Sequence, residues 1–206
     1  MSKYHLITFG CQMNKSDSER IAMVLENCGW KPTSNINEAD LIIINACSVR
    51  QSGVDRVYGK INNLIKLKTK NKKLKIFLTG CILPTDRKKL KKMVDLIFEI
   101  KDLPRLPQFF GFKGLSNFEK DYFQIKPLYS SPFFAYVPIM TGCNNFCSYC
   151  VVPYTRGREI SRSPIDILKE IKELIKRGYK EIILLGQNVN SYKFGKVTFP
   201  KLLRMI

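Results

Sequence analysis

The sequence predicts an α/β protein, in which a doubly wound, mostly parallel sheet is followed by the first βα units of a second domain. Short β-prone apolar segments recur at 4–9, 41–45 and 74–79, as is typical of buried parallel strands. Helical patterns fill the gaps between them, and the spacing suits a strand, a crossover helix and a return strand. A second strand–helix–strand pattern fills the last third of the chain. We therefore expect domains at 1–125 and 133–206.

The other expected elements follow from apolar periodicity and from capping residues. Ser16 and Asp17 are capping candidates for the first helix, and Gly178 is a stop signal for a later one. In the first domain we expect helices at 16–27, 54–67 and 84–93, a strand at 94–100 and loop-rich chain at 103–132. In the second domain we expect strands at 134–140 and 181–185, a helix at 164–177 between them, and another helix beginning before Ile206.

Cys11, Cys47 and Cys81 each follow one of the first three predicted strands after a single small residue, at intervals of 36 and 34 residues. Because the carboxyl ends of parallel strands meet at one edge of a sheet, we expect these side chains to converge. The alternative is that small, apolar cysteines only pack near strand ends. Cys28, near a helix end, and His5, inside a strand, are interpreted as packing residues of that kind.

Cys143, Cys147 and Cys150 form the strongest motif, with three cysteines inside eight residues. Three thiolates on one loop can hold three irons of a 4Fe–4S cluster and leave the fourth iron open to a substrate. Zinc and chance are alternatives, but zinc usually needs a fourth Cys or His, and His5 is the only histidine. An odd total of seven cysteines, without an export signal, argues against a disulfide framework.

The charge of the chain favours a polyanionic partner. Lys and Arg number 35 against 17 Asp and Glu, a formal net charge of +18, and 60–92 holds twelve basic residues and one acid. Such a field attracts nucleic acid, although solvated charge in a lysine-rich composition is the alternative. Arg162 is a further candidate for a phosphate or a carboxylate. The candidate RNA contacts are Lys88, Lys89, Lys91, Lys92, Arg156 and Arg158.

Composition also excludes several classes of protein. An apolar fraction of 45% is enough for a packed core, so the chain is not wholly disordered. The longest charge-free stretch, 127–155, is interrupted by polar residues, Pro and Gly, and the first residues lack the apolar run of a signal peptide. We expect a cytoplasmic protein without a membrane segment.

The cysteine loop, with Tyr149 as the aromatic residue before its last cysteine, resembles the signature of the radical S-adenosylmethionine (SAM) superfamily. The first three cysteines and their surroundings narrow the resemblance to the methylthiotransferases, most of all to the MiaB-type tRNA enzymes. The segments that carry this resemblance are GCQMN at 10–14, NACSVR at 45–50, TGC at 79–81, GCN at 142–144, VVPYTRGRE at 151–159 and GQNVN at 186–190.

The resemblance implies two 4Fe–4S clusters and SAM as cofactors. Cys11, Cys47 and Cys81 would hold an auxiliary cluster, and Cys143, Cys147 and Cys150 the cluster whose open iron binds SAM. Tyr149, Gly186, Gln187 and Asn188 would contact SAM, although Gly and Asn are also ordinary turn residues. The implied fold is a partial (β/α) radical-SAM barrel after the N-terminal domain. No general acid or base is identified.

The implied reaction adds sulfur and a methyl group to isopentenyladenosine beside the anticodon of tRNA, at position 37, giving its 2-methylthio derivative. Related enzymes act on threonylcarbamoyladenosine in tRNA or on a ribosomal protein, and a non-catalytic iron–sulfur or RNA-binding module is the alternative from another class. Expected partners are tRNA, a flavodoxin- or ferredoxin-like electron donor and a sulfur source, with the protein a monomer. Since only two barrel strands are present, we expect a truncated form whose own activity is in doubt.

Overall fold

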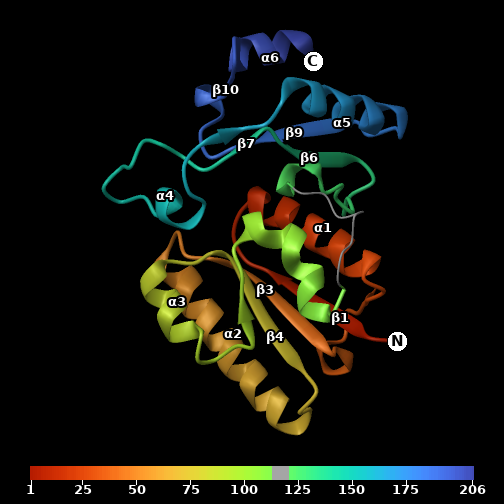
Figure 1. The fold of residues 1–206 in the computed structure, drawn as a ribbon, viewed down its shortest axis with the longest axis vertical. Coiled ribbons are helices and arrows are strands. Elements are labelled where there is room, and N and C mark those ends of the chain that lie inside the picture. The colour runs from red at the N-terminus through yellow and green to blue at the C-terminus, as the bar shows by residue number, and fades with distance from the viewer. Residues whose placement is uncertain (113–120) are drawn as a thin grey trace. The chain divides into compact units, whose positions relative to one another are not determined.

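A computed structural model describes residues 1–112 and 121–206 of the chain (Figure 1). They form two compact units, Met1–Leu128 and Tyr129–Ile206, called unit 1 and unit 2 below. Among the described residues, no helix is both long and apolar enough to cross a bilayer.

Unit 1 is built on one parallel sheet in the order β2-β1-β3-β4-β5. The central strand β3 pairs with β1 on one side and, over its full length, with β4 on the other. The strands are β1 (Lys3–Thr8), β2 (Lys31–Pro32), β3 (Leu41–Cys47), β4 (Lys75–Cys81) and β5 (Leu96–Ile97). This arrangement confirms the predicted doubly wound, parallel α/β fold.

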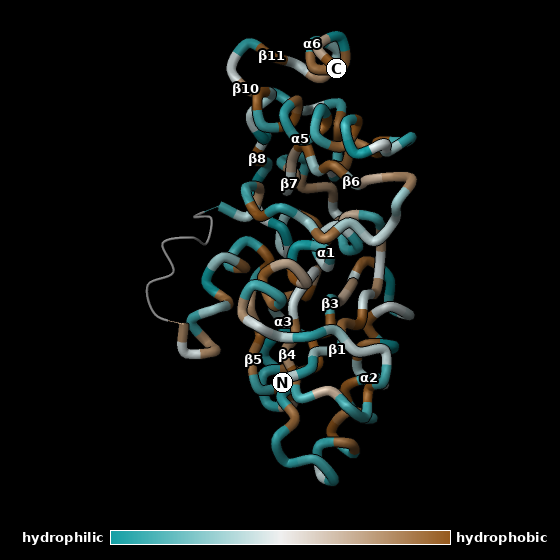
Figure 2. The backbone as a smooth tube through the Cα atoms, turned by 90° about the vertical axis from the view of Figure 1, so that its right-hand side faces the viewer, coloured by the Kyte–Doolittle hydropathy of each residue, from teal (hydrophilic) through white to brown (hydrophobic). Residues whose placement is uncertain are grey.

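Helices cover both faces of this sheet because side chains alternate along β3. Leu41 and Ile43 join one core with α1 (Gln12–Asn27) and the 3₁₀ segment η2 (Ile100–Phe110). Ile42 and Ile44 join a second core with α2 (Gln51–Lys70) and α3 (Pro84–Leu90). In Figure 2 the chain is hydrophobic around β3 and β5, between these two layers.

Several predicted elements of unit 1 differ from the structure. Helix α2 is longer than the predicted 54–67 by three residues at each end, and α3 ends at Leu90 rather than at residue 93. Helix α1 begins at Gln12 rather than at residue 16, so Ser16 and Asp17 lie inside it and are fully buried. The strand expected at 94–100 is only the two-residue β5. The expected loop after residue 103 is partly helical: η2 buries Ile100, Leu103 and Leu106, whose spacing of three matches a 3₁₀ turn. The minor elements η1 (Ile36–Glu38) and η3 (Tyr122–Gln124) complete the unit.

Unit 2 contains one parallel strand pair joined by a crossover helix. Strand β6 (Phe134–Pro138) pairs with β9 (Glu181–Leu185), and α5 (Pro164–Lys176) packs Ile167, Ile171 and Leu174 against them. The strand predicted at 134–140 is divided at Ile139, and β7 (Met140–Thr141) then pairs antiparallel with β8 (Ile160–Ser161). The remaining elements are α4 (Val152–Thr155), η4 (Val189–Ser191), β10 (Lys193–Phe194), β11 (Val197–Thr198) and α6 (Phe199–Met205). The helix expected before Ile206 is α6.

Candidate metal centres

The first three cysteines lie at the carboxyl edge of the sheet in unit 1. Cys47 and Cys81 are the last residues of β3 and β4 and are register partners, and Cys11 is the N-cap of α1, three residues after β1. The strand order reverses direction between β1 and β3. In open parallel sheets of this order, ligands bind outside the carboxyl ends of the strands at that reversal. The sheet therefore brings Cys11 and Cys47 to its ordinary ligand-binding position.

Glycines let the chain close tightly around this edge. A Cβ atom on Gly10 would lie 2.8 Å from the Cβ of Cys47, and one on Gly80 would lie 2.4 Å from the carbonyl oxygen of Ala46. Both glycines have positive φ angles, +110° and +95°, which side chains rarely adopt. The small residue before each cysteine, already visible in the sequence, is thus required at these two positions by backbone conformation and by space.

The three cysteines differ in exposure. Cys11 is exposed, Cys47 is half-buried and Cys81 is 4% exposed. Within 1–112 and 121–206, no three Cys, His, Asp or Glu side chains form a group arranged to hold a metal ion. The assignment of these cysteines as cluster ligands is therefore a prediction that rests on their shared edge.

In unit 2, Cys143, Cys147 and Cys150 lie on one loop between β7 and α4. The backbone N–H of Cys150 donates to the carbonyl oxygen of Cys147 at 2.9 Å, and Phe146, the residue before Cys147, has a φ of +47°. Cys143 is 8% exposed, whereas the other two are half-buried. A positive φ at a phenylalanine is strained, and such strain is concentrated at functional sites.

The segment 157–159 holds the start of this cysteine loop. Cys143 donates its backbone N–H to the carbonyl oxygen of Gly157 at 3.2 Å. A Cβ on Gly142, whose φ is +75°, would lie 2.0 Å from the carbonyl oxygen of Arg158. The backbone N–H of Glu159 donates to Oδ1 of Asn144 at 3.1 Å. The loop is therefore attached along one side by two hydrogen bonds and by the close approach of Gly142 to Arg158.

Glu159 also connects the cysteine loop to the turn after β9. Its carboxylate Oε2 accepts a hydrogen bond from the Ser191 hydroxyl at 2.6 Å, and that hydroxyl lies 2.8 Å from the carbonyl oxygen of Asn188. Asn188 is one of the predicted SAM contacts. Sequence reasoning did not assign roles to Glu159 and Ser191, because they are 32 residues apart and neither belongs to a cysteine motif.

The remaining predicted SAM contacts have distinct environments. Tyr149 is 88% exposed. Gly186 packs so closely on Met140 that a Cβ would lie 2.5 Å from the Met140 Cγ. Gln187 has a buried amide oxygen, Oε1, that accepts no hydrogen bond from any described residue. A buried, unsatisfied acceptor is costly, and one at the end of a strand is a position where a ligand can donate.

Comparison with known proteins agrees with both units. Residues 3–99 match the uncharacterized protein family UPF0004, and 137–204 match the radical SAM superfamily. A tRNA-2-methylthio-N(6)-dimethylallyladenosine synthase of Syntrophomonas wolfei is 47% identical over 98% of this chain and 48% of its own length. A protein of the same name from Clostridioides difficile is 45% identical over 97% of this chain and 45% of its own. Nearly the whole chain is therefore similar to these two synthases, and its two parts match one family model each. It spans about half the length of these curated relatives.

A solved structure is similar in fold to this chain. The radical SAM methyltransferase TsrM of Kitasatospora setae aligns with all of the chain and 51% of its own length, with a TM-score of 0.63. At 10% identity, this likeness concerns the fold alone. It agrees with the predicted beginning of a partial radical-SAM barrel in unit 2.

The match of 137–204 to the radical SAM superfamily implies a 4Fe–4S cluster and SAM, and the loop of unit 2 suits both groups chemically. Thiolates are the ligands of iron–sulfur clusters, and three of them leave one iron open. The unsatisfied Oε1 of Gln187 suits a donor such as an amino group. In unit 1, the close approach of Gly10 to Cys47 and the pairing of Cys47 with Cys81 suit a second thiolate-bound group.

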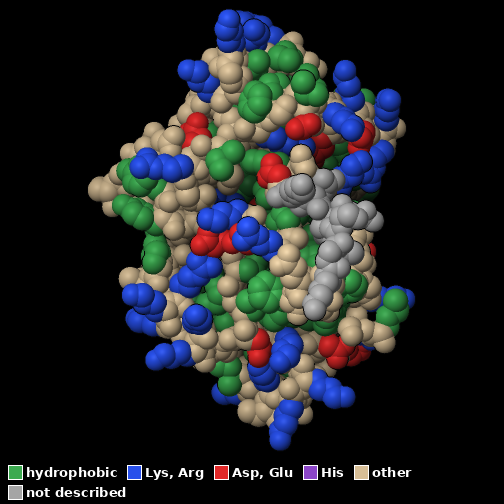
Figure 3. Space-filling view, in the orientation of Figure 1, with side chains coloured by type: hydrophobic (Ala, Val, Ile, Leu, Met, Phe, Trp, Pro, Cys, Tyr) green, Lys and Arg blue, Asp and Glu red, His purple; other side chains and the backbone are tan. Residues whose placement is uncertain are grey.

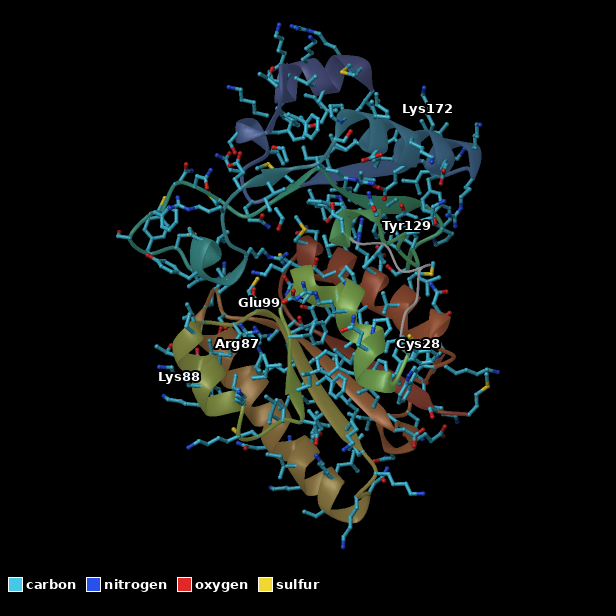
Figure 4. The ribbon with its side chains drawn as sticks, in the orientation of Figure 1. Cys28, Arg87, Lys88, Glu99, Tyr129 and Lys172 are labelled. Carbon is cyan, nitrogen blue, oxygen red and sulfur yellow. The ribbon has the colours of Figure 1, made fainter. Side chains whose placement is uncertain are left out.

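The predicted RNA contacts on α3 and after it are all exposed: Lys88, Lys89, Lys91 and Lys92. Beside them, Arg87 forms an ion pair with Glu99 at 2.7 Å, as labelled in Figure 4. Figure 3 shows many more Lys and Arg than Asp and Glu side chains on the face that it presents. The four lysines are thus available to solvent next to a satisfied ion pair.

The three arginines that follow the cysteine loop have different roles. The Arg158 guanidinium lies 4.2 Å from the ring centre of Phe146, a cation–π contact at the exposed loop, and Arg156 is half-buried. Arg162, proposed above as a phosphate or carboxylate contact, is 8% exposed and forms an ion pair with Glu170 inside unit 2. That assignment is therefore wrong: Arg162 is neutralised by a carboxylate of α5.

Cys28 and His5 are packing residues, as predicted. Cys28 is the C-cap of α1, is 8% exposed, and its burial raises the pKa of its thiol to about 11. Such a thiol stays protonated and is a poor metal ligand. His5 lies in β1, and its Nδ1 is 2.8 Å from the carbonyl oxygen of Thr33.

Proposed function

We propose that the protein to which this chain belongs is a radical-SAM methylthiotransferase that acts on tRNA. The observation that carries the proposal is the presence of two separate three-cysteine sets in one chain, one at the edge of the unit 1 sheet and one on the loop of unit 2. The relatives that cover the chain are named for 2-methylthio-N(6)-dimethylallyladenosine synthesis in tRNA. The proposed substrate is the isopentenyladenosine at position 37 beside the anticodon, and its 2-methylthio derivative is the product.

In this proposal each cysteine set holds one 4Fe–4S cluster. Cys11, Cys47 and Cys81 hold the auxiliary cluster, and Cys143, Cys147 and Cys150 hold the cluster that binds SAM. When bound together, a reduced cluster and SAM supply radical chemistry that protein side chains lack. The contribution of the chain is to position these groups and to exclude water from them.

The residues after β9 orient SAM in the proposed site. Gly186 leaves room for the Met140 side chain beneath the turn, and the buried Oε1 of Gln187 accepts from the SAM amino group. The Ser191 hydroxyl, held by Glu159, lies against the Asn188 carbonyl and so fixes the turn relative to the cysteine loop. Tyr149, on the loop itself, offers an exposed ring to the cofactor.

tRNA is held in part by the exposed lysines of unit 1. Lys88, Lys89, Lys91 and Lys92 supply phosphate contacts that carry no sequence information. Changing the four to Gln weakens tRNA binding and flattens its salt dependence, because fewer counterions are released. Binding measured over a salt series checks this, and an unchanged slope and affinity would remove the patch from the proposal. The proposal also includes a flavodoxin- or ferredoxin-like electron donor, a sulfur source, a monomeric state and a cytoplasmic location.

Anaerobic reconstitution with iron and sulfide tests the two cluster sites. We expect about eight irons per chain, and about four when Cys143, Cys147 and Cys150 are changed to Ala, since each cube needs its own thiolates. Cys28→Ser is the matched control, because that thiol is buried at the opposite end of α1 from Cys11 and belongs to neither set, and it leaves the iron content unchanged. Uptake of one zinc and no iron would reject the proposal.

A non-catalytic iron–sulfur or RNA-binding module would load iron in the same way, so a second measurement is needed. Reduced, reconstituted protein is mixed with SAM and assayed for 5′-deoxyadenosine, with the Syntrophomonas wolfei relative, about twice as long, as the positive control. SAM binding by the chain itself is followed through its effect on the cluster spectrum. Loss of that effect in Gln187→Leu supports the proposed contact with the SAM amino group. A spectrum that SAM does not change in the parent chain would favour the non-catalytic module.

A further inference from the structure

Unit 1 buries a layer of polar side chains directly beneath its three cysteines. Asn14 and Asn45 are fully buried, and Ser18 is 7% exposed. Burying an amide is costly unless its hydrogen bonds are made, and an apolar residue of similar size would fill the same space without that cost. The presence of two amides here therefore calls for a specific geometric role.

The hydrogen bonds of the two amides are reciprocal. Asn14 Nδ2 donates to Asn45 Oδ1 at 3.2 Å and to the Ala46 carbonyl oxygen at 2.8 Å. Asn45 Nδ2 donates to the Asn14 carbonyl oxygen at 2.7 Å and to the Ser18 hydroxyl at 3.0 Å. The Ser18 hydroxyl is in turn 2.7 Å from that of Thr8, at the end of β1. A satisfied network of this kind in a low-dielectric interior selects one arrangement of the elements that it joins.

The residue before each cysteine contacts one of these two amides. A Cβ on Gly10 would lie 3.3 Å from Cγ of Asn14, and a Cβ on Gly80 would lie 2.4 Å from Oδ1 of Asn45. Ala46 accepts the hydrogen bond from Asn14. Asn14 also meets a cysteine directly, since the Cys11 Sγ is 3.5 Å from its Oδ1. The backbone next to all three cysteines is thus in contact with the same two side chains, Asn14 and Asn45.

We infer that Asn14 and Asn45 are positioning residues that set the spacing of Cys11, Cys47 and Cys81 for a thiolate-bound metal group. They touch the backbone from which the cysteines project, on α1, β3 and β4. The inference rests on the proposed auxiliary site of unit 1. It adds to that proposal the residues that determine its geometry.

Co²⁺ is a suitable probe because thiolate-to-cobalt charge-transfer bands report how many thiolates reach one metal ion. The experiment uses the whole chain with Cys143, Cys147 and Cys150 changed to Ala, so that only the edge of unit 1 can bind. Asn14→Leu and Asn45→Leu keep the size and neutrality of the amides but remove their hydrogen bonds. Residues that orient metal ligands typically contribute 10–100-fold to metal affinity, so we expect Co²⁺ binding to weaken by about that factor and the charge-transfer band to fall.

Two serines of α1 give a matched comparison in case the leucine variants fail to fold. Ser18→Ala removes a hydroxyl of the network, whereas Ser16→Ala removes an equally buried hydroxyl that accepts instead from Arg20 at 2.7 Å. Ser18→Ala loses the hydrogen bonds with Asn45 and Thr8, whereas Ser16→Ala loses one hydrogen bond from a charged guanidinium. A hydrogen bond to a charged group is worth about twice a neutral one, so we expect similar losses of stability. Only Ser18→Ala should weaken Co²⁺ binding and alter the electron paramagnetic resonance spectrum of the reconstituted, reduced cluster.

The outcomes separate this inference from the function on which it rests. The parent protein here is the chain with only Cys143, Cys147 and Cys150 changed to Ala. The positioning role would be overturned, and the cluster site left intact, if this parent shows three-thiolate bands while the folded Asn14, Asn45 and Ser18 variants bind Co²⁺ with unchanged affinity. Equal losses in Ser16→Ala and Ser18→Ala would also overturn it, because the effect would then follow stability alone. Parent protein that binds no Co²⁺ would overturn both.

Discussion

The two sets of three cysteines are brought together in opposite ways. In unit 1 they come from residues 34 and 36 apart, at the ends of parallel strands, above buried amides. In unit 2 they lie within eight residues, on one partly exposed loop that segment 157–159 holds by backbone contacts. The first set therefore depends on the carboxyl edge of the sheet, and the second on local attachments. Damage at that edge should affect stability and metal binding together, whereas damage to the loop should change metal binding alone.

The largest effect is expected at Gly80, where β3 and β4 meet. In Gly80→Ala the new Cβ would lie 2.4 Å from both the Ala46 carbonyl oxygen and the Asn45 Oδ1, at a φ of +95°. Strain and overpacking together should lower the free energy of unfolding of unit 1 by about 3 kcal/mol. The measurement is urea unfolding followed by fluorescence of Trp30, the only tryptophan, which packs on Phe110.

Gly29→Ala is the matched control for Gly80→Ala. Gly29 also has a positive φ, +78°, but a Cβ there would meet no atom within 4 Å. Its cost is conformational only, about 1 kcal/mol. Equal losses in the free energy of unfolding in the two variants would mean that the close approach of β4 to β3 adds nothing to the cost of Gly80→Ala. The dependence of the cysteine edge on the packing of these strands would then lose its main support.

A smaller and more local effect is expected at Gly142. In Gly142→Ala the Cβ would lie 2.0 Å from the Arg158 carbonyl oxygen, so the cysteine loop must move away from segment 157–159. We expect reconstituted protein to lose about four irons per chain, while the Trp30 unfolding transition stays in place. Gly157→Ala, with a φ of +80° and open space around it, is the control and should keep its iron. A shift of the Trp30 transition by Gly142→Ala would show that the two sites are not independent.

The same difference explains what the sequence could predict. The loop of unit 2 is recognisable by spacing alone, and the strand–cysteine repeat identifies the edge of unit 1 because parallel strands end together. The buried layer under that edge was not predictable: Asn14 and Asn45 are 31 residues apart, and their pairing depends on the register of β1, β3 and α1. Likewise, Arg162 is an ordinary arginine in the sequence, and only the packing of α5 turns it into half of a buried ion pair.

The smallest effect is expected at the amino end of the unit 1 sheet, away from the cysteines. Asp95 accepts from Lys68 Nζ at 2.5 Å and from the backbone N–H of Ile76, the second residue of β4, at 2.8 Å. Partial burial raises the pKa of Asp95, but the hydrogen bonds from Lys68 and Ile76 outweigh it, so the pKa is lowered overall. A carboxylate with a lowered folded-state pKa stabilises the fold above its unfolded pKa of about 3.9, and this is lost as the pH falls through the folded value.

Asp95→Asn should therefore be less stable than the parent at pH 7, and the difference should shrink towards pH 3. Solvent reaches this ion pair, so the expected loss at pH 7 is only about 0.5 kcal/mol. Urea unfolding of both proteins at the two pH values, followed by Trp30 fluorescence, measures it. Co²⁺ binding at pH 7 should be the same in both, because the change is at the opposite ends of the strands from Cys47 and Cys81. Weaker Co²⁺ binding in Asp95→Asn would mean that the metal affinity of Cys11, Cys47 and Cys81 falls with any loss of sheet stability. A separate positioning role for Asn14 and Asn45 would then be unsupported.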